Sequence, residues 1–212
     1  MPSLAPAAIR TRVRIPLRFG DGYETEAEVV TFTGLEDGLE HLALGLGAFD
    51  AVDVPLVRPH SECLTGDVFG SQRCDCGAQL REAAERITDA GGWLLYLRQE
   101  GRGIGLYNKL DAYALQDQGL DTYAANRALE FADDERDYTA AAQMLAALGV
   151  RRAALLTNNP DKPARLRELG LQVEAVHRTG VHLRPANAHY LRAKAEQTGH
   201  ALDLGGLLGR AA

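Results

Sequence analysis

The sequence predicts an α/β protein in which mainly antiparallel amino-terminal strands are followed by alternating helices and strands in a layered α/β sheet. Two patterns support this fold class. Apolar and polar residues alternate over residues 9–18 and 42–46, as in strands that bury one face. From about residue 78 onward, helical stretches alternate with short apolar runs. With 212 residues, 46% of them apolar and 25% charged, the chain has the composition of an ordinary globular protein with one sizeable core.

The amino-terminal β-rich part is expected over about residues 9–58. Arginines alternate with apolar residues over residues 9–18, which predicts a half-buried strand. A Gly-Asp-Gly turn at residues 20–22 follows, and the glutamates at positions 24, 26 and 28 share one face of the next strand. A hairpin would therefore pair a row of arginines with a row of glutamates on the sheet surface. Further strands are predicted over residues 42–46 and 52–57.

The α/β part is expected over about residues 59–200, and we take it as the catalytic part of one domain that spans residues 1–212. Neither an internal repeat nor a linker interrupts it. Helical patterns predict helices over residues 78–90, where two glycines end the pattern, over 104–118 and 134–148, and just after Pro160. Apolar runs predict strands over residues 93–97, 153–157 and 171–176.

Charge, hydropathy and cysteine usage limit the partners and the compartment. The net charge of −6 argues against binding nucleic acid across the surface, which usually requires a basic excess, and favours a small phosphorylated ligand met by a local basic cluster. No apolar run approaches the ~18 residues of a membrane span, and residues 1–10 do not resemble a signal peptide. Three cysteines, an odd number, lie together within residues 63–76, which does not fit a disulfide framework. We therefore expect a cytoplasmic protein without a membrane or nucleic-acid partner.

The cysteines indicate a metal site. Ten residues separate Cys63 from Cys74, and Cys76 follows, so a folded-back loop can present three thiolates to one cation. Zinc prefers soft sulfur ligands, and three protein ligands leave a fourth position for water, as in catalytic sites. Zinc lowers the pKa of such water to ~7. The alternatives are three buried reduced cysteines and a structural zinc site completed by His60.

A glycine-rich stretch follows the apolar run at 93–97. Its glycines let phosphates approach backbone N–H groups at a helix start, and Arg98 and Arg102 can add charge-assisted hydrogen bonds. The alternative is a tight strand-to-helix turn with solvated arginines. In the helix that follows, Leu106, Leu110 and Tyr113 share one face, so Tyr113 either packs in the core or orients a purine or a water.

Two further segments are candidates for the site. The acidic run at residues 133–137 precedes a helical pattern, where acids commonly cap a helix and interact with its dipole. Residues 157–162 join the carboxyl end of a strand to a helix, which is where α/β sheets usually bind ligands. Lys162 can reach a phosphate there.

Together these segments closely resemble GTP cyclohydrolase II. They follow in the order of that family and are rich in charged and glycine positions that no generic fold requires. Residues 1–50 are less distinctive. The segment at 187–194 keeps part of a terminal family motif but has Ala188 and Ala193 where an acid and a threonine are common. The matching stretches are residues 58–66, 73–77, 98–109, 112–119, 131–137 and 155–162.

The resemblance implies hydrolysis of GTP to formate, pyrophosphate and a diaminopyrimidinone ribosylamino phosphate at the start of riboflavin synthesis. It implies Zn²⁺ bound by the three cysteines, which activates water for attack on C8 of the purine, Mg²⁺ with the GTP phosphates, and a homodimer. Tyr113 would lie beside the base. The substrate contacts implied are Arg58, Pro59, His60, Ser61, Glu62, Gln79, Glu100, Gly101, Arg102, Thr122, Thr157 and Lys162.

The resemblance also implies that Asp134 is a proton acceptor and that Arg136 is a nucleophile at the α-phosphate. A guanidinium with a pKa above ~12 more commonly clamps phosphate charge, so both roles of Arg136 stay open. Residues two apart on a regular helix face different ways. Cooperation between Asp134 and Arg136 therefore requires irregular backbone at this helix start.

Two other functions compete with this interpretation. The triplet His60-Ser61-Glu62 is similar to part of the zinc-dependent nucleotide deaminase pattern, but that pattern needs Pro-Cys-x-x-Cys and this chain has Cys74-Asp75-Cys76. A zinc-stabilised nucleic-acid-binding module is disfavoured by the acidic balance and by the missing fourth thiol.

Overall fold

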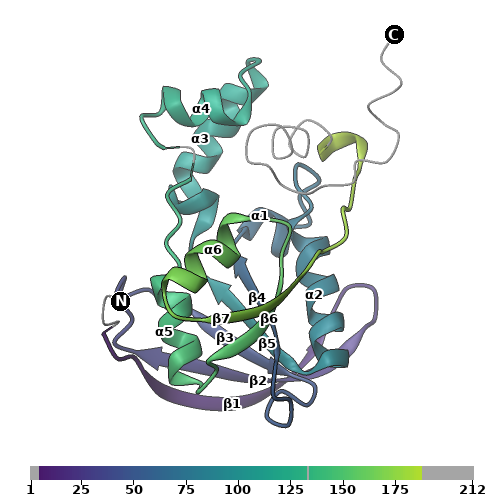
Figure 1. Ribbon diagram of the computed structural model, residues 1–212. Coiled ribbons are helices and arrows are strands. Elements are labelled where there is room, and N and C mark those ends of the chain that lie inside the picture. Colours follow the sequence, from purple (N-terminus) through teal and green to yellow (C-terminus); the bar gives the residue numbers. More distant parts are fainter. Residues whose placement is uncertain (1–4, 133, 188–212) are drawn as a thin grey trace.

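The computed structural model describes residues 5–132 and 134–187 of the chain (Figure 1). Within these residues seven strands form one mixed sheet in the order β1-β2-β3-β5-β4-β6-β7. The first three strands are antiparallel to their neighbours, and β3 joins β5 in antiparallel fashion, whereas β5, β4, β6 and β7 run parallel. The predicted fold class is confirmed. The strands are β1 (Ala8–Arg18), β2 (Glu24–Thr33), β3 (Leu42–Leu46), β4 (Leu56–Ser61), β5 (Gly92–Leu97), β6 (Arg152–Leu156) and β7 (Gln172–His177).

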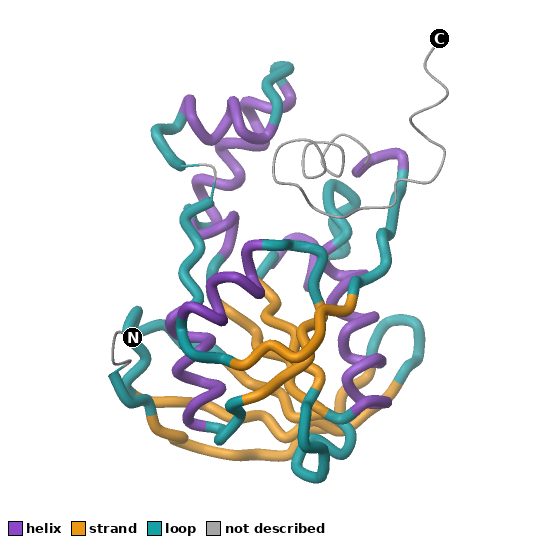
Figure 2. The backbone as a smooth tube through the Cα atoms, viewed as in Figure 1, coloured by secondary structure: helices purple, strands orange, loops and turns teal. Residues whose placement is uncertain are grey.

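Helices cover both faces of the sheet, as Figure 2 shows. Side chains of α2 pack with Leu94 and Leu156 on one face, and side chains of α5 and α6 pack with Leu95 and Leu155 on the other. Successive residues of β5 and β6 thus enter opposite cores, as the twofold strand repeat requires. The helices are α1 (Leu64–Asp67), α2 (Cys76–Ala90), α3 (Leu106–Asp117), α4 (Thr122–Ala128), α5 (Thr139–Ala147) and α6 (Asp161–Glu168), with short 3₁₀ turns at Glu100–Gly103 and Pro185–Asn187.

The amino-terminal hairpin pairs its charge rows as predicted. Arg14 lies 3.2 Å from Glu26 and Arg18 lies 3.4 Å from Glu24. The prediction that the first strand is half-buried is wrong for its middle, where Val13 is 47% exposed. The reason is position: β1 is the sheet edge, and only its ends, near Ile9 and Leu17, pack against the two cores.

The strand expected at 52–57 is displaced to β4. Its polar residues Arg58 and His60 conceal the strand from a search for apolar runs, although they are buried. Strand β6 pairs with β4 only at Leu56 and Val57. From Arg58 onward, β4 therefore has no hydrogen-bonded strand partner on the side that faces β6. A proline is tolerated at position 59 for this reason, and the gap beside the strand leaves space for a site.

The helix predicted from 134 begins only at Thr139, and the helices α1 and α4 were not predicted. Together with α4, α3 extends away from the sheet (Figure 1). No helix in the described part of the chain is long and apolar enough to cross a membrane. Beyond Asn187, the terminal motif at 187–194 lies outside the described residues.

Candidate active site

A cleft lies at the carboxyl ends of β4, β5 and β6, which is the usual ligand position in an α/β sheet. It is also lined by α3 and by the loop that enters α6. The structure therefore brings together segments that are far apart in the sequence. The lining includes these residues expected from the sequence: Arg58, His60, Ser61, Glu62, Cys63, Cys74, Cys76, Gln79, Glu100, Gly101, Arg102, Tyr113, Arg136, Thr157 and Lys162.

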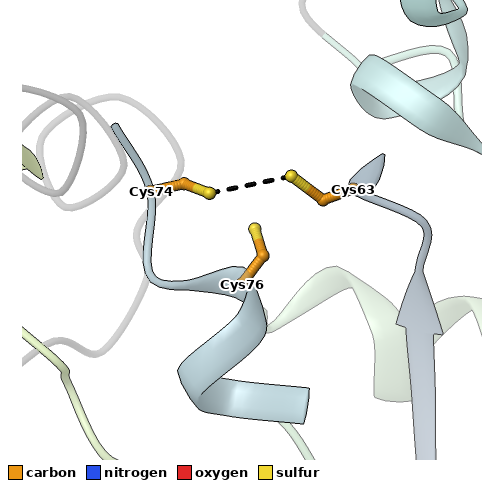
Figure 3. A group of neighbouring side chains, drawn as sticks. All are labelled: Cys63, Cys74 and Cys76. Atoms are coloured by element: carbon orange, nitrogen blue, oxygen red, sulfur yellow. Dashed lines mark hydrogen bonds between the residues drawn. The ribbon is translucent and has the colours of Figure 1, made fainter. Parts of the chain in front are cut away.

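The sulfur atoms of the three cysteines point toward one another (Figure 3), and all three residues line the cleft. Their sulfur atoms all lie within 4.8 Å of one another, and the sulfurs of Cys63 and Cys74 are 3.6 Å apart. Cys63 follows β4, whereas Cys76 begins α2. Among the described residues, this group contains three thiols and no histidine. His60, the proposed fourth ligand of a structural site, bonds Asp67 instead, at 3.2 Å.

The charge around the cluster favours a cation. Hydrogen bonds from the Cys74 and Cys76 thiols, together with the nearby Lys109 ammonium, hold the pKa of Cys63 well below its ordinary value. The same contact with Cys63 raises the pKa of Cys74 to about 11. The cluster therefore carries negative charge at neutral pH. Three soft sulfur donors, without a fourth ligand among the residues that the structure describes, fit zinc with an open position.

Gly66 is required by this cluster, and the sequence analysis did not identify it. A Cβ atom at Gly66 would lie 2.8 Å from the Cys74 sulfur and 3.1 Å from the Cys63 sulfur. A Cβ atom only 2.8 Å from the Cys74 sulfur would force that sulfur or the backbone to move. Only glycine lets the turn after Cys63 close over the thiols.

Gly66→Ala is expected to weaken zinc binding by about 10-fold or more, because the added methyl displaces the sulfurs by a few tenths of an ångström. Chelator competition measures the change. Gly20→Ala is the matched control, since a Cβ at Gly20 meets nothing within 4 Å. Equal zinc affinity in both variants would contradict the role of Gly66.

Asp67 fixes the loop that carries Cys63. Its carboxylate accepts hydrogen bonds from the Cys63 backbone N–H at 3.0 Å and from the Tyr96 hydroxyl at 2.9 Å, in addition to its contact with His60. Burial lowers the pKa of His60, so the ring is neutral at neutral pH. Its Nδ1 is buried without a hydrogen-bond partner among the described residues, which leaves one polar atom for a ligand.

The glycine-rich stretch forms a tight left-handed turn. Gly101 and Arg102 both have φ near +60°, which is uncommon for arginine and indicates local strain. The turn packs against the acidic segment: the Glu135 backbone N–H donates to the Arg102 carbonyl at 3.0 Å, and a Cβ at Gly103 would lie 2.9 Å from Glu135. Arg98, expected at the phosphates, instead pairs with Glu62 at 2.8 Å and is absent from the cleft lining.

Asp134 and Arg136 form a pair on irregular backbone, as their cooperation requires. The Arg136 guanidinium donates from Nε to Asp134 Oδ1 at 2.8 Å and from Nη2 to Oδ2, and its backbone N–H also donates to Oδ1. The prediction of a helix from 134 is wrong because Asp137 accepts from Thr139 N–H, and α5 begins there. Burial raises the pKa of Asp134, but the bonds from Arg136 outweigh it and hold the pKa low. Arg136 lines the cleft, whereas Asp134 is not among the lining residues.

Buried cations form the floor between β4 and α6. Arg58 donates to the Leu156 carbonyl at 3.0 Å and to Gln79 at 2.9 Å, and Gln79 in turn donates to Asp75 at 2.6 Å. Lys162 donates to the Pro59 carbonyl at 2.7 Å. Cations held on protein acceptors in this way are positioned before an anionic ligand arrives.

Not every residue that was expected to contact the substrate is part of the cleft lining. Pro59 contributes a carbonyl to Lys162 but is not part of the lining. Thr122 is the first residue of α4, and its expected contact stays a prediction. Thr157 lines the cleft, and its hydroxyl accepts from the Asn159 N–H at 3.0 Å, which fixes the loop into α6.

The face of α3 that borders the cleft differs from the predicted one. Leu110 is 44% exposed, whereas Lys109 and Ala112 are buried. Tyr113 lines the cleft with its ring 4.5 Å from the Arg73 guanidinium, and burial raises its pKa to about 12, so the phenol is neutral. A search for polar residues at helical spacing finds two of the lining residues that sequence reasoning missed. These two are Lys109 and Gln116, and the other polar lining residues not expected from the sequence are Asn126, Asn158 and Asn159.

A cleft at the carboxyl ends of parallel strands that combines buried cations with three clustered thiols is typical of an enzyme active site. The cations can bind an anionic ligand, and the thiols can hold a metal.

Comparison with known proteins gives the family. The family model for GTP cyclohydrolase II matches residues 10–178. A Vibrio parahaemolyticus protein named GTP cyclohydrolase-2 is 52% identical over 91% of this chain and 98% of its own length. A protein of the same name from Psychromonas ingrahamii is 53% identical over 91% of this chain and 97% of its own. The riboflavin biosynthesis protein RibBA of Thermotoga maritima is 49% identical over 83% of this chain and 45% of its own. The chain belongs to the GTP cyclohydrolase II family and is an enzyme.

Proposed function

We propose that this enzyme hydrolyses GTP to 2,5-diamino-6-ribosylamino-4(3H)-pyrimidinone 5′-phosphate, formate and pyrophosphate, the first step of riboflavin biosynthesis. The observation that carries the proposal is that a single cleft holds the three thiols together with Arg58, Arg136 and Lys162. A nucleoside triphosphate has a base and a polyphosphate at opposite ends, and this cleft offers a different chemistry for each. Family membership supports the same substrate.

At the base end, Cys63, Cys74 and Cys76 would hold Zn²⁺. When bound, the metal supplies Lewis-acid chemistry that activates water and polarises a carbon–nitrogen bond. The neutral Tyr113 phenol lies on the same side and can donate or accept one hydrogen bond at the purine. His60, Ser61 and Glu62 also line the cleft, and the ring and ribose would lie against them.

Arg58, Arg136 and Lys162 would bind the triphosphate, with the turn at Gly101 and Arg102 closing over it. Mg²⁺ would enter with the phosphates. Within the described residues the cysteines form the only group of three or more His, Cys, Asp or Glu side chains able to hold a metal, and Mg²⁺ is commonly held mainly by phosphates and water.

Asp134 and Arg136 would act at the α-phosphate. Asp134 holds the guanidinium through two of its nitrogens, and Arg136 lines the cleft. The carboxylate is ionised and can accept a proton, or it can polarise the arginine for the transfer of the nucleotidyl group. From the resemblance and the thiol usage we also propose a cytoplasmic homodimer.

A product assay tests the proposal. Incubation of the zinc-loaded enzyme with GTP and Mg²⁺ is expected to release one formate and one pyrophosphate per GTP consumed, without ammonia. Ammonia without formate would identify a deaminase and overturn the proposed reaction. Absence of turnover together with salt-sensitive RNA binding would favour a nucleic-acid-binding module instead.

A further inference from the structure

We propose that Lys109 is a positioning residue of the metal centre, whose ammonium orients the Cys63 sulfur and balances the negative charge of the three thiolates. The inference rests on the proposed zinc site. It assigns to the first turns of α3 a function in metal binding, separate from any contact with GTP.

The contacts of Lys109 use its full donor capacity. A lysine ammonium has three N–H donors and no acceptor. The Lys109 nitrogen lies 3.2 Å from the Cys63 sulfur, 3.1 Å from the Thr65 hydroxyl oxygen and 2.8 Å from a Glu100 carboxylate oxygen. Three acceptors for three donors fix the ammonium in one orientation. A lysine in a nucleotide cleft commonly binds phosphate, but all three donors of this one are already engaged on protein atoms.

The surrounding backbone is shaped for this approach. Lys109 is only 7% exposed, and its backbone N–H donates a hydrogen bond to the Gly105 carbonyl at the start of α3. A Cβ at Gly101 would lie 3.0 Å from the Lys109 Cβ, so a side chain at 101 would crowd the lysine. Glu100 bridges the two parts: one oxygen accepts from Lys109 and the other accepts from the Leu64 N–H at 2.7 Å, next to Cys63.

Charge gives the lysine its effect on metal binding. Three thiolates and one Zn²⁺ carry a net charge of about −1 in a largely buried place, and Glu100 adds another negative charge nearby. The Lys109 ammonium offsets one of these charges and contacts one sulfur directly. Without it, assembly of the zinc–thiolate cluster beside an unpaired carboxylate costs more free energy.

The test measures zinc affinity by chelator competition in wild type, Lys109→Met and Lys162→Met. Lys162 is the matched control because it is equally buried in the same cleft and its ammonium donates to the Pro59 carbonyl. We expect Lys109→Met to bind zinc about 10- to 100-fold more weakly and Lys162→Met to stay within about twofold of wild type. Lys109→Arg keeps the charge and is expected to bind zinc more tightly than Lys109→Met.

A second readout reports on the sulfur itself. In the cobalt-substituted protein, an ammonium that donates to a thiolate stabilises its lone pair, so Lys109→Met is expected to move the sulfur-to-cobalt charge-transfer band to longer wavelength. The band of Lys162→Met is expected not to move. If Lys109→Met does not fold, Lys109→Gln is measured in its place.

Three results would overturn the inference. Wild-type zinc affinity with an unmoved cobalt band in Lys109→Met shows that the lysine only packs. Equal losses of affinity in Lys109→Met and Lys162→Met show a general effect of cleft charge. A wild-type protein that binds no zinc removes the metal site and this inference together, whereas the first two results leave the zinc site intact.

Discussion

Cys74→Ser is expected to remove zinc from the protein and to lower formate release by on the order of 10³-fold or more. A serine hydroxyl is a poor zinc ligand at neutral pH, and Cys74 is one of only three grouped metal-ligating side chains within the described residues, with its sulfur 3.6 Å from that of Cys63. Ring opening then loses the Lewis acid that makes water reactive near pH 7. Metal analysis of the purified variant and a formate assay measure both effects.

The control for this substitution is wild-type enzyme stripped of metal by a chelator. Added zinc is expected to restore formate release to the stripped wild type and not to Cys74→Ser. Both proteins need comparable thermal unfolding in the metal-free state for the comparison to report on chemistry. A Cys74→Ser variant that keeps one zinc per chain and full formate release would remove the cysteine cluster from the mechanism.

Arg136→Lys is expected to slow pyrophosphate release by about 10²- to 10³-fold while zinc content stays at the wild-type value. Lysine keeps the positive charge but loses the planar fork through which Arg136 engages Asp134 at two nitrogens. Loss of one well-aimed donor to transition-state charge commonly has an effect of this size. Pyrophosphate and formate are measured in the same reactions, so a loss at the phosphate is separated from a loss at the base.

Arg152→Lys is the matched control, because Arg152 also pairs with a carboxylate, Glu174 at 2.9 Å, but lies at the start of β6, away from the cleft. It is expected to keep wild-type rates. Pyrophosphate release within about twofold of wild type in Arg136→Lys would show that the planar fork of the guanidinium is not needed at this position.

The sequence predicted the elements whose patterns are local. The pairing of arginines with glutamates follows from the alternation in β1 and β2 and the turn between them. The alternation of helix and strand after residue 78 likewise predicted the layered sheet. The burial of β1 was not predictable in this way, because a strand pattern does not show which strand lies at the edge of the sheet.

The errors lie where function overrides the local pattern. Strand β4 carries Arg58, Pro59 and His60 at buried positions, so it does not look like a central strand in the sequence. The buried face of α3 is polar around Lys109 for the same reason. Sites commonly violate the rules of a well-packed fold, and the misplaced elements here surround the cleft.

The metal cluster shows what sequence spacing can and cannot give. The spacing of Cys63, Cys74 and Cys76 indicated a three-thiol site, and the structure places the sulfurs together. The need for glycine at position 66 could not be read from spacing, because it depends on how α1 and α2 pack over the thiols. The same holds for Lys109, whose three acceptors come from two separate segments, the turn with Cys63 and Thr65 and the turn that begins at Glu100.

The most direct measurement is a crystal structure of the zinc-loaded enzyme with a non-hydrolysable GTP analogue, with anomalous difference maps collected at the zinc absorption edge. The account predicts one zinc peak about 2.3 Å from each of the three sulfurs, with the imidazole ring of the guanine facing its fourth position and the phosphates on Arg58, Arg136 and Lys162. A zinc peak elsewhere, or a guanine bound with its imidazole ring turned away from the three sulfurs, would contradict it.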